Sequence, residues 1–553
     1  MRRVDDVDAS AQDRPHAGPA DTQDDVRPAD TQDDVRPATP DRSGTAAVPA
    51  PDGAARPGPT ARQLVALLAD PGTFTCWDEA PAAPTADPGY RASLARARER
   101  TGLDEAVVTG VLRLAGRPVA VVACEFAFLG GSIGVATAER VTRAVERATA
   151  ERLPLVALPV SGGTRMQEGA AAFLCMLRIT AAVQAHQAAG LPYLTYLRNP
   201  TMGGVFASWG TLGHLVLAEP GSRLGFLGPR VYEELRGVRL PPDVQLAETL
   251  ARRGLVDAVV APQALRETLR RTLTVLCDRP APAAVPDPGA PPAARPPLDA
   301  WASVRRTRRP ERPGTRELLA RATEETVRLE APGGEEGALV RALAVFHGRP
   351  AVVVGQQRQG PGRERPFTAA DLRAVRRTAG LAEQLGLPLV TVVDTAGAEL
   401  SARAELDGVA VEIAYCLTTL LALRTPVLAV LLGQGSGGGA LALLPADRVV
   451  AAEHAWLAPL PPEGASAIVH RDGGHAAELA RSQGIGAYDL AAVGLVDQIV
   501  PELPDAADES DDFCDRVGRA VASALATLTA TAEPERAAAR RRRHRRLGDT
   551  LGS

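Results

Sequence analysis

The sequence predicts an α/β fold that is used twice along the chain. Short apolar runs alternate with alanine-rich stretches of helical periodicity, which is typical of strands and helices that alternate in a mostly parallel sheet. The same order of segments also recurs after a fixed offset: Pro154 and Pro388 are 234 residues apart, and so are Pro192 and Pro426. An offset held over more than a hundred residues in each half predicts one fold, duplicated.

The composition is that of a globular protein, with 553 residues of which 45% are hydrophobic and 23% are charged. A formal net charge of −4 creates no global field that attracts nucleic acid, and we expect no nucleic-acid partner. No run of about 18 apolar residues and no apolar N-terminal region is present. We therefore expect a cytoplasmic protein without membrane contact. Six scattered cysteines with no CxxC pair argue against a disulfide framework and against a structural zinc site.

Three breaks in composition set the expected domain boundaries. Residues 1–58 are rich in Pro, Asp, Ala and Gly and contain a tandem copy of ADTQDDVRP, which predicts a disordered N-terminal segment. Residues 279–299 are proline-rich and predict a stiff linker. The two predicted domains are thus 59–278 and 300–533. A basic tail follows at 534–553, and we expect it to be solvated rather than to contact nucleic acid or an acidic partner.

Strands and helices alternate within each block. In the first block the run LPLVALPV, which ends at Val160, predicts a buried strand, and helices are expected at 137–151 and 170–190. The stretch SGGTRMQEG lies between that strand and the second helix. In the second block a helix is expected at 369–386, and the strand after it again ends at a small-residue turn.

The turns between strands and helices are where we expect the chemistry. Glycine permits a sharp turn and a close approach to backbone N–H groups, and a helix N-terminus presents unpaired N–H donors with a partial positive charge. Two such turns on neighbouring strands can direct donors at one point, which is the geometry of an oxyanion hole. A single pair could be only a tight turn, but matching pairs in both blocks favour the functional interpretation. The turns are Gly162–Gly163, Gly203–Gly204, Ala396–Gly397 and the run at 433–441.

The sequence offers no obvious alternative catalyst. It contains no HExxH pair and no Walker pattern. The histidines are expected to be structural or solvent-facing. Those considered are His214, His347, His454, His470 and His475.

Several motifs resemble a known enzyme family. FAFLGGSIG at 126–134, SGGTRMQEG and the segment 199–234 resemble the β half of the bacterial acetyl-CoA carboxylase carboxyltransferase. In the second block, GQGSGGGALAL at 433–443 resembles the α half of the same enzyme. The resemblance covers about residues 60–278 and 300–505, so the chain looks like a β–α fusion in one polypeptide.

The resemblance implies a crotonase-like fold in each half and a carboxyl transfer. The donor would be carboxybiotin held on a biotin carboxyl carrier protein, and the acceptor an acyl-CoA, with malonyl-CoA formed from acetyl-CoA. In the chemistry that the resemblance implies, the N–C bond of carboxybiotin breaks to release CO2 and leave a ureido anion, which would take the proton from the thioester α-carbon. The resulting enolate would attack the CO2, so two oxyanions would need stabilisation and no side-chain base would be required. The resemblance also implies a biotin carboxylase partner and a homo-oligomer, a dimer or larger. Each site would lie between the first half of one protomer and the second half of another.

The same resemblance assigns roles to individual residues. Arg165 would help to fix the CoA or the helix end, and an ion pair with Glu168 is an open alternative. The residues implied for the thioester oxygen are Gly162 and Gly163, helped by Gly203 and Gly204. The residues implied for the biotin carbonyl are Gly397, Gly438, Gly439 and Ala440. The residues implied for substrate binding are Gly130, Gly131, Ser132, Arg165, Gln357 and Arg358.

The chain also departs from the family pattern. The N-terminal zinc ribbon of the β family is missing, so we expect no zinc and no other metal. DTAGAELSARAE at 394–405 lacks two prolines and a glycine of the α family, and Gln434 replaces a carboxylate. These departures gather on the biotin side. Two alternatives therefore stay open: a crotonase-like hydratase, isomerase or decarboxylase that does not use biotin, and a non-catalytic CoA-binding or assembly protein.

Overall fold

The computed structural model describes residues 58–81, 87–278, 298–329, 339–357 and 365–547. The predictions for the N-terminal segment, for most of the proline-rich linker and for Arg358 fall outside these residues.

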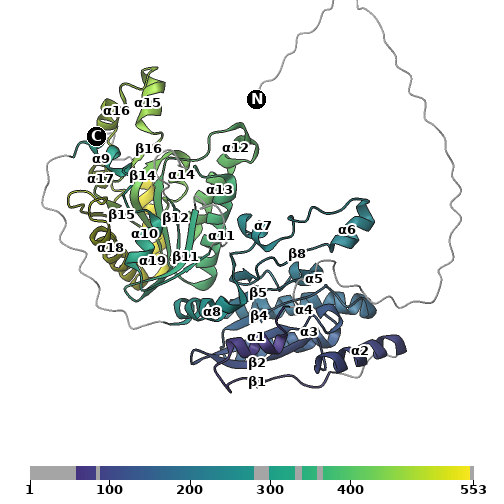
Figure 1. Ribbon diagram of the computed structural model, residues 1–553. Helices are drawn as coiled ribbons and strands as arrows, with labels where there is room; N and C mark the ends of the chain where they lie inside the picture. The colour runs from purple at the N-terminus through teal and green to yellow at the C-terminus, as the bar shows by residue number, and fades with distance from the viewer. Residues whose placement is uncertain (1–57, 82–86, 279–297, 330–338, 358–364, 548–553) are drawn as a thin grey trace, which may run out of the picture. The chain divides into compact units, whose positions relative to one another are not determined.

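The first half is built on a seven-stranded sheet (Figure 1) with the order β1-β2-β3-β4-β5-β7-β9. β2 and β3 form an antiparallel hairpin, and from β3 onward neighbouring strands are parallel. β6 and β8 form a separate parallel pair. The strands are β1 (Thr75–Cys76), β2 (Val107–Leu114), β3 (Arg117–Cys124), β4 (Leu155–Leu158), β5 (Tyr193–Leu197), β6 (Thr201–Met202), β7 (Leu215–Ala218), β8 (Leu224–Gly225) and β9 (Ala258–Val259).

Helices cover both faces of this sheet. Successive residues of β3 point to opposite faces, so Val121 packs in one apolar cluster with α1 and α8, while Val122 packs in another with α3 and α4. β4, β5 and β7 are accordingly buried along their whole length. The helices are α1 (Ala61–Leu68), α2 (Pro88–Thr101), α3 (Val135–Ala150), α4 (Gly169–Ala188), α5 (Gly203–Phe206), α6 (Pro229–Arg236), α7 (Ala247–Arg252) and α8 (Pro262–Cys277), with 3-10 turns η1 (Leu129–Gly131) and η2 (Met166–Glu168).

The second half has its own sheet, in the order β10-β11-β12-β13-β14-β15-β17, with β16 paired to β14. Its strands are β10 (Glu325–Arg328), β11 (Leu339–Phe346), β12 (Arg349–Gln356), β13 (Leu389–Thr395), β14 (Val427–Ser436), β15 (Arg448–Ala452), β16 (Trp456–Ala458) and β17 (Gln498–Val500). Its helices are α9 (Ala300–Thr307), α10 (Thr315–Ala322), α11 (Ala369–Leu385), α12 (Ala402–Leu406), α13 (Val409–Ala422), α14 (Gly437–Leu441), α15 (Pro462–Val469), α16 (Ala476–Ser482), α17 (Ala487–Ala492), α18 (Ser510–Ala530) and α19 (Glu533–Arg546).

The predicted duplication of an α/β fold is confirmed. The order β2-β3-β4-β5-β7-β9 of the first sheet matches β11-β12-β13-β14-β15-β17 of the second, strand for strand. The register repeats as well: Leu155 pairs with Tyr193, and Leu389, 234 residues later, pairs with Val427.

The three helices expected from periodicity are observed, each within two residues of its predicted ends. α11 shows the local reason. Thr368 Oγ1 accepts the N–H of Asp371, and the Asp371 carboxylate accepts the N–H of Thr368, which together form a capping box. Gly386 ends the helix in the left-handed conformation.

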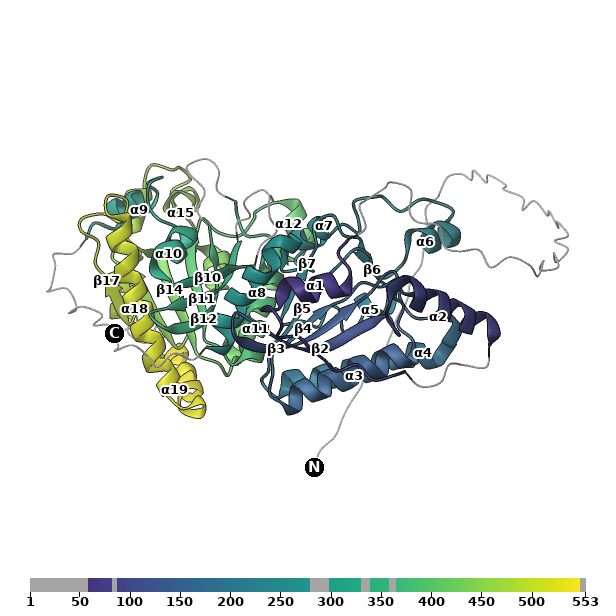
Figure 2. The ribbon, with the colours of Figure 1, turned by 60° about the horizontal axis from the view of Figure 1, so that its bottom comes forward.

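The basic C-terminal run is not a solvated tail, which corrects the sequence-based expectation. It forms α19, which follows α18 along the second sheet (Figure 2). Arg540 is buried: its guanidinium binds both carboxylate oxygens of Asp447, at 2.8 and 2.6 Å, and donates to carbonyls at the C-terminal end of α13, among them that of Leu423. The helix is therefore part of the second half, because these acceptors lie about a hundred residues earlier in the chain and could not be read from a local charge run.

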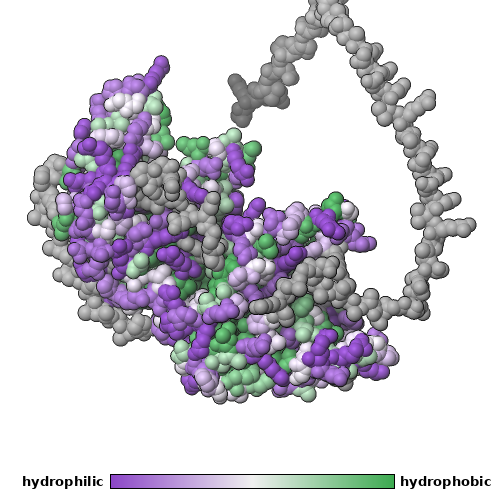
Figure 3. Space-filling view, in the orientation of Figure 1, coloured by the Kyte–Doolittle hydropathy of each residue, from purple (hydrophilic) through white to green (hydrophobic). Residues whose placement is uncertain are grey.

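One helical stretch among the described residues, Met166–Ala188, is long and apolar enough to cross a membrane by length and composition alone. Much of its apolar surface is exposed, including Phe173, Leu174 and Leu177. Apolar surface is also visible over α6 and α12 (Figure 3). Exposed apolar patches of this kind mark interaction sites.

Candidate active site

The two glycine turns of the first half touch each other. Gly163 follows β4 with φ +119°, and Gly203 opens α5 with φ +62°. A Cβ atom on Gly203 would lie 3.3 Å from Gly163 Cα. Gly163 therefore requires glycine for its conformation, and Gly203 requires it for conformation and for space. The two strand ends predicted to converge do converge.

The N–H groups at these turns divide into two kinds. Gly162 N–H donates to Gly130 O at 2.8 Å, and Gly163 N–H donates to Ser161 Oγ at 3.0 Å. Gly203 and Gly204 instead lie in the first turn of α5, where N–H groups have no acceptor within the helix. This differs from the sequence-based assignment, in which Gly162 and Gly163 were the principal donors. In the structure they shape the turn, and α5 presents the donors.

The second half repeats this arrangement. Gly397 follows β13 with φ +129°, and its N–H donates to Thr395 Oγ1 at 2.8 Å, as Gly163 donates to Ser161. A Cβ on Gly439 would lie 3.0 Å from the carbonyl carbon of Gly397. Gly397 is thus also a shaping residue, and the donors belong to α14.

One residue of this second turn was missed. Gly437 opens α14 with φ +59°, which matches Gly203 at an offset of 234. The adjacent glycines had instead been aligned one residue later, Gly204 with Gly439. The strict offset was the signal that could have found Gly437. Gly438 and Ala440 follow in α14, and a Cβ on Gly438 would meet Ile413 of α13 at 2.6 Å.

The residues of FAFLGGSIG support the first turn from behind. Gly130 supplies the carbonyl that accepts the Gly162 N–H. Gly131 lies directly against the Val160 carbonyl, with no space for a side chain. The Ser132 carbonyl accepts from Arg165 Nη2 at 2.8 Å. Their observed contacts are with the protein itself.

Arg165 is buried, with 1% of its side chain exposed, and its partner is Glu105. Arg165 Nη2 lies 2.6 Å from Glu105 Oε1, and Nη1 lies 3.1 Å from Oε2, whereas the nearest Glu168 oxygen is 3.6 Å away. Burial opposes its charge, but the hydrogen bonds and charge of Glu105 outweigh burial and raise the pKa of Arg165. Arg165 therefore anchors the turn mainly through Glu105, rather than through Glu168 as the alternative in the sequence analysis had it.

Gln357 lies at the end of β12, half-buried. Its Oε1 accepts the N–H of Arg316 at 3.0 Å, and its Nε2 lies 3.4 Å from Glu317. These contacts join it to the start of α10.

A cleft of about 1060 Å³ lies between α2, α3 and the segment around Glu168, and the described residues that line it include none of the four turn glycines. Tyr90 lines it and donates to Glu168 Oε1, and burial followed by that hydrogen bond raises the pKa of Tyr90 to about 12. Arginines line the α3 side. They are Arg140, Arg143 and Arg147.

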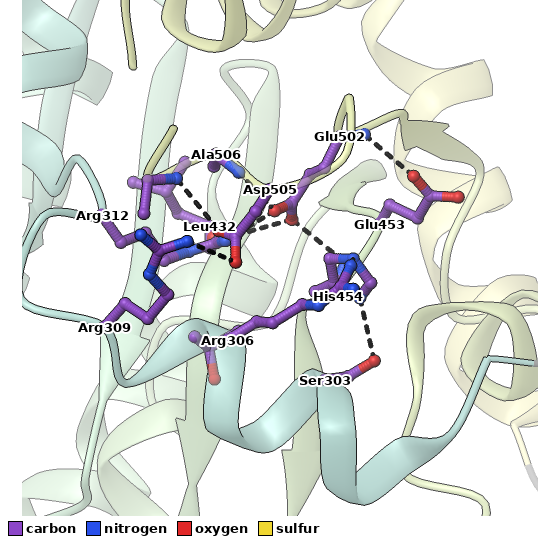
Figure 4. A network of polar contacts seen from close by, with 12 residues as sticks. Ser303, Arg306, Arg309, Arg312, Leu432, Glu453, His454, Glu502, Asp505 and Ala506 are labelled. Atoms are coloured by element: carbon purple, nitrogen blue, oxygen red, sulfur yellow. Dashed lines mark hydrogen bonds and ion pairs between the residues drawn. The ribbon is translucent and has the colours of Figure 1, made fainter. Parts of the chain in front are cut away.

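A buried polar network lies beneath β14 (Figure 4). Arg312 and Glu502 form a bidentate ion pair at 2.7 and 2.8 Å with no exposed surface, and Arg312 also donates to Leu432 O at 2.8 Å. Burial would raise the pKa of Glu502, but Arg312 lowers it overall. His454 bonds Ser303 at 3.0 Å, and burial lowers its pKa, in line with the expected structural role.

Among the described residues, no group of three or more His, Cys, Asp or Glu side chains is placed to hold a metal ion. The six cysteines are free. Burial raises the pKa of the Cys124 thiol to about 11 and that of the Cys416 thiol to about 12, so both are neutral thiols at pH 7.

Comparison with known proteins gives the same picture along most of the chain. A family model described as the carboxyl transferase domain matches residues 58–541. The chain is 57% identical over 491 residues to a probable biotin-dependent acyl-coenzyme A carboxylase beta3 subunit of Mycobacterium tuberculosis, covering 88% of this chain and 98% of that protein. It is 40% identical over 517 residues to the acetyl-coenzyme A carboxylase carboxyl transferase subunits beta/alpha of Salinispora arenicola, covering 88% and 90%.

Solved structures give the fold. The transcarboxylase 12S structure with hydrolysed methylmalonyl-coenzyme A bound superposes with a TM-score of 0.67 at 22% identity, covering 85% of this chain and 89% of that one. A single-chain, multi-domain long-chain acyl-CoA carboxylase superposes with a TM-score of 0.62 at 18% identity. The two halves are tandem crotonase-like domains, as predicted.

Proposed function

The chain belongs to the carboxyl transferase domain family, and from this premise we propose that it is the carboxyltransferase component of a biotin-dependent acyl-CoA carboxylase. In this proposal a carboxyl group passes from carboxybiotin, held on a carrier protein, to acetyl-CoA, and malonyl-CoA is formed. The chain combines the β-like and α-like halves of that enzyme in one polypeptide, and a separate biotin carboxylase supplies the carboxybiotin.

The observation that carries the proposal is the repeated pair of glycine turns, one in each half. Carboxyl transfer places negative charge on two oxygens, the thioester oxygen of the acyl-CoA and the ureido oxygen of biotin. Gly203 and Gly204 at the start of α5 supply N–H donors for the first, and Gly437, Gly438 and Gly439 at the start of α14 supply donors for the second. Donors fixed in this way stabilise charge that develops in the transition state. An enzyme with one oxyanion hole would need only one such glycine turn, not one in each half.

The first half is the proposed acyl-CoA side. The cleft between α2, α3 and the segment around Glu168 has the volume of a ligand site. On its α3 wall Arg140 is buried in its pair with Asp104, whereas Arg143 and Arg147 are more than half exposed in weak surface pairs, and such exposed guanidinium groups suit the phosphates of CoA. Acetyl-CoA and propionyl-CoA differ by one methylene, which is worth about 1 to 3 kcal/mol in a pocket. The choice of acetyl-CoA therefore depends on a direct measurement.

The exposed helices support the proposed homo-oligomer. α4 follows the first glycine turn and exposes Phe173 and Leu177, and α13 follows the equivalent turn of the second half and exposes Val411 and Tyr415. A two-fold dimer that packs α4 of one copy against α13 of the other would cover both faces. It would bring the first half of one protomer to the second half of its partner. We propose that this cytoplasmic dimer, or a larger assembly of it, is the active form.

A reverse-direction assay tests the function. Purified full-length protein is given malonyl-CoA and biocytin, acetyl-CoA formation is followed, and methylmalonyl-CoA is run in parallel. Biocytin-dependent turnover with a preference for malonyl-CoA is the expected result. Turnover without biocytin would replace the proposal with a decarboxylase, and folded protein with no turnover of either substrate would replace it with a non-catalytic CoA-binding protein. A preference for methylmalonyl-CoA would keep carboxyl transfer and change the substrate.

A further inference from the structure

The last part of β14 makes a detour just before the biotin-side turn. Val393 of β13 pairs with Leu431, yet Thr395, two residues on, pairs with Gly435, four residues on. Leu432, Gly433 and Gln434 therefore all stand opposite one residue, Asp394. An irregularity of this kind redirects a strand and the residues that follow it. Here the residues that follow are those of the Gly437 turn.

Asp394 fills the detour from the β13 side. Its side chain is buried, with 3% exposed, and its Oδ1 accepts the N–H of Gln434 at 2.9 Å. The carboxylate lies directly against Gly433, where a Cβ would be 2.5 Å from Oδ1. The detour is thus built around this one carboxylate: the hydrogen bond holds Gln434, and the absent side chain of Gly433 makes the space.

Two arginines hold the same three residues from outside. Arg312, anchored by Glu502, donates to Leu432 O at 2.8 Å (Figure 4). Arg308 donates from Nε to Gln434 Oε1 at 3.2 Å and pairs with Glu463 through both carboxylate oxygens. The path of the chain into α14 is therefore fixed at the backbone of Leu432, at the backbone of Gln434 and at the side chain of Gln434.

The first half makes the same detour without a carboxylate. Ser161 pairs with Thr201, which is the equivalent of Thr395 with Gly435 at an offset of 234. The residue equivalent to Asp394 is Val160, and the residue equivalent to Gln434 is Pro200. Proline has no N–H to satisfy, so an apolar valine suffices there. In the second half the buried N–H at this position is therefore satisfied by a carboxylate. In the first half both the N–H and the carboxylate are absent.

We propose that Asp394 is a positioning residue for the biotin-side glycine turn, because its carboxylate takes the buried Gln434 N–H and so sets the path of β14 into Gly437 and α14. This inference rests on the proposed function for its kinetic consequence and on the geometry alone for its structural one. In the first half the equivalent positions hold Val160 and Pro200, which form no such hydrogen bond. We therefore expect a change at Asp394 to affect the turn of the second half only.

The test compares variants of the full-length protein in the malonyl-CoA and biocytin assay. Asp394→Asn keeps an oxygen that accepts the Gln434 N–H, and we expect kcat within about threefold of wild type, since the acceptor is retained. Asp394→Val removes the acceptor, and we expect kcat to fall about 10- to 100-fold with the KM for malonyl-CoA unchanged, the scale of a small misplacement near the chemistry. Asp394→Glu keeps the charge but is too long for the space beside Gly433, and we expect the same loss. Thr378→Val, which removes another buried hydrogen bond in the middle of α11, is the stability control, and its kinetics should match wild type.

Hydrogen–deuterium exchange of residues 427–439 gives a readout that does not depend on activity. Exchange should accelerate in Asp394→Val and Asp394→Glu, and stay at the wild-type rate in Asp394→Asn and Thr378→Val. Wild-type kinetics and exchange in Asp394→Glu or Asp394→Val would overturn the inference, and so would Asp394→Asn behaving like Asp394→Val. If wild type itself shows no biocytin-dependent turnover, the proposed function fails, while the exchange comparison still decides whether Asp394 positions the turn. If the valine variant does not fold, the glutamate variant decides both readouts.

Discussion

Gly163 and Gly203 come from two different strand ends and leave no space for a side chain between them, since a Cβ on Gly203 would lie 3.3 Å from Gly163 Cα. In the second half Gly397 is approached instead by Gly439, two residues after the equivalent of Gly203, and a Cβ on Gly439 would lie 3.0 Å from the Gly397 carbonyl carbon. The candidate site is thus built, in both halves, from glycines without side chains rather than around a reactive side chain.

The first prediction concerns Gly203. Gly203→Val adds a β-branched side chain at φ +62° against Gly163, so it displaces the start of α5 and its donors. We expect a loss of kcat of about 100-fold or more, the scale of losing an oxyanion-hole donor. Gly380→Ala, in α11 with open space around it, is the matched control and should keep wild-type kinetics. Normal turnover in the Gly203→Val variant would show that α5 does not contribute to the site.

The second prediction concerns the C-terminal helix. Arg540→Ala leaves the buried Asp447 carboxylate and the last carbonyls of α13 without their main donor. We expect the free energy of unfolding to fall by about 3 kcal/mol, as when a buried ion pair is broken. Denaturant unfolding measures it, with Arg541→Ala on the exposed face of α19 as the control, expected within about 0.5 kcal/mol of wild type. An equal change in the free energy of unfolding in the two variants would contradict the burial of Arg540 and favour a solvated tail.

The third prediction concerns His214 and pH. Its Nδ1 accepts the N–H of Tyr193 at 3.0 Å, which needs the neutral ring, and burial, followed by the charge of His186, lowers its pKa from 6.5 to about 4. Because the unfolded chain binds the proton more readily, His214 contributes stability above pH 6.5 that is lost as pH falls from 6.5 toward 4. The free energy of unfolding should therefore decline across that window in wild type.

His214→Asn tests this assignment, because an asparagine oxygen can accept the same N–H without titrating. The decline between pH 6.5 and 4 should become shallower in the variant. The same slope in both proteins would assign the pH dependence to other groups.

How far the sequence alone could predict the site depends on how local each signal is. The duplication and the glycine turns could be predicted, because a repeat offset and strand-to-helix punctuation are visible within short windows. The pairing of Arg165 with Glu105 could not, since the two lie 60 residues apart and a nearer carboxylate, Glu168, competed for the interpretation. The burial of Arg540 could not be predicted for the same reason, because its partner Asp447 is 93 residues away. Gly437 was within reach, but the adjacent-glycine pattern was given more weight than the exact offset.

The fourth prediction tests whether the site is shared between protomers. Gly203→Val inactivates the first half of a chain, and Gly439→Val, which would drive a side chain into Gly397 and Ala398, inactivates the second. If each site combines the first half of one protomer with the second half of its partner, a mixed dimer of the two variants contains one site with both defects and one with none.

Random pairing on co-expression makes half of the dimers mixed, so activity should return to about one quarter of wild type when neither variant alone is active. The measurement is the malonyl-CoA and biocytin assay on protein purified through two different tags, one on each variant, which selects mixed dimers and should raise the activity to about one half. A site built within one chain gives no recovery at any mixing ratio, because every chain then carries a defect in its own site. Recovery would also explain why α4 and α13 keep apolar faces exposed on a single chain, since the partner that covers them is the one that completes the site.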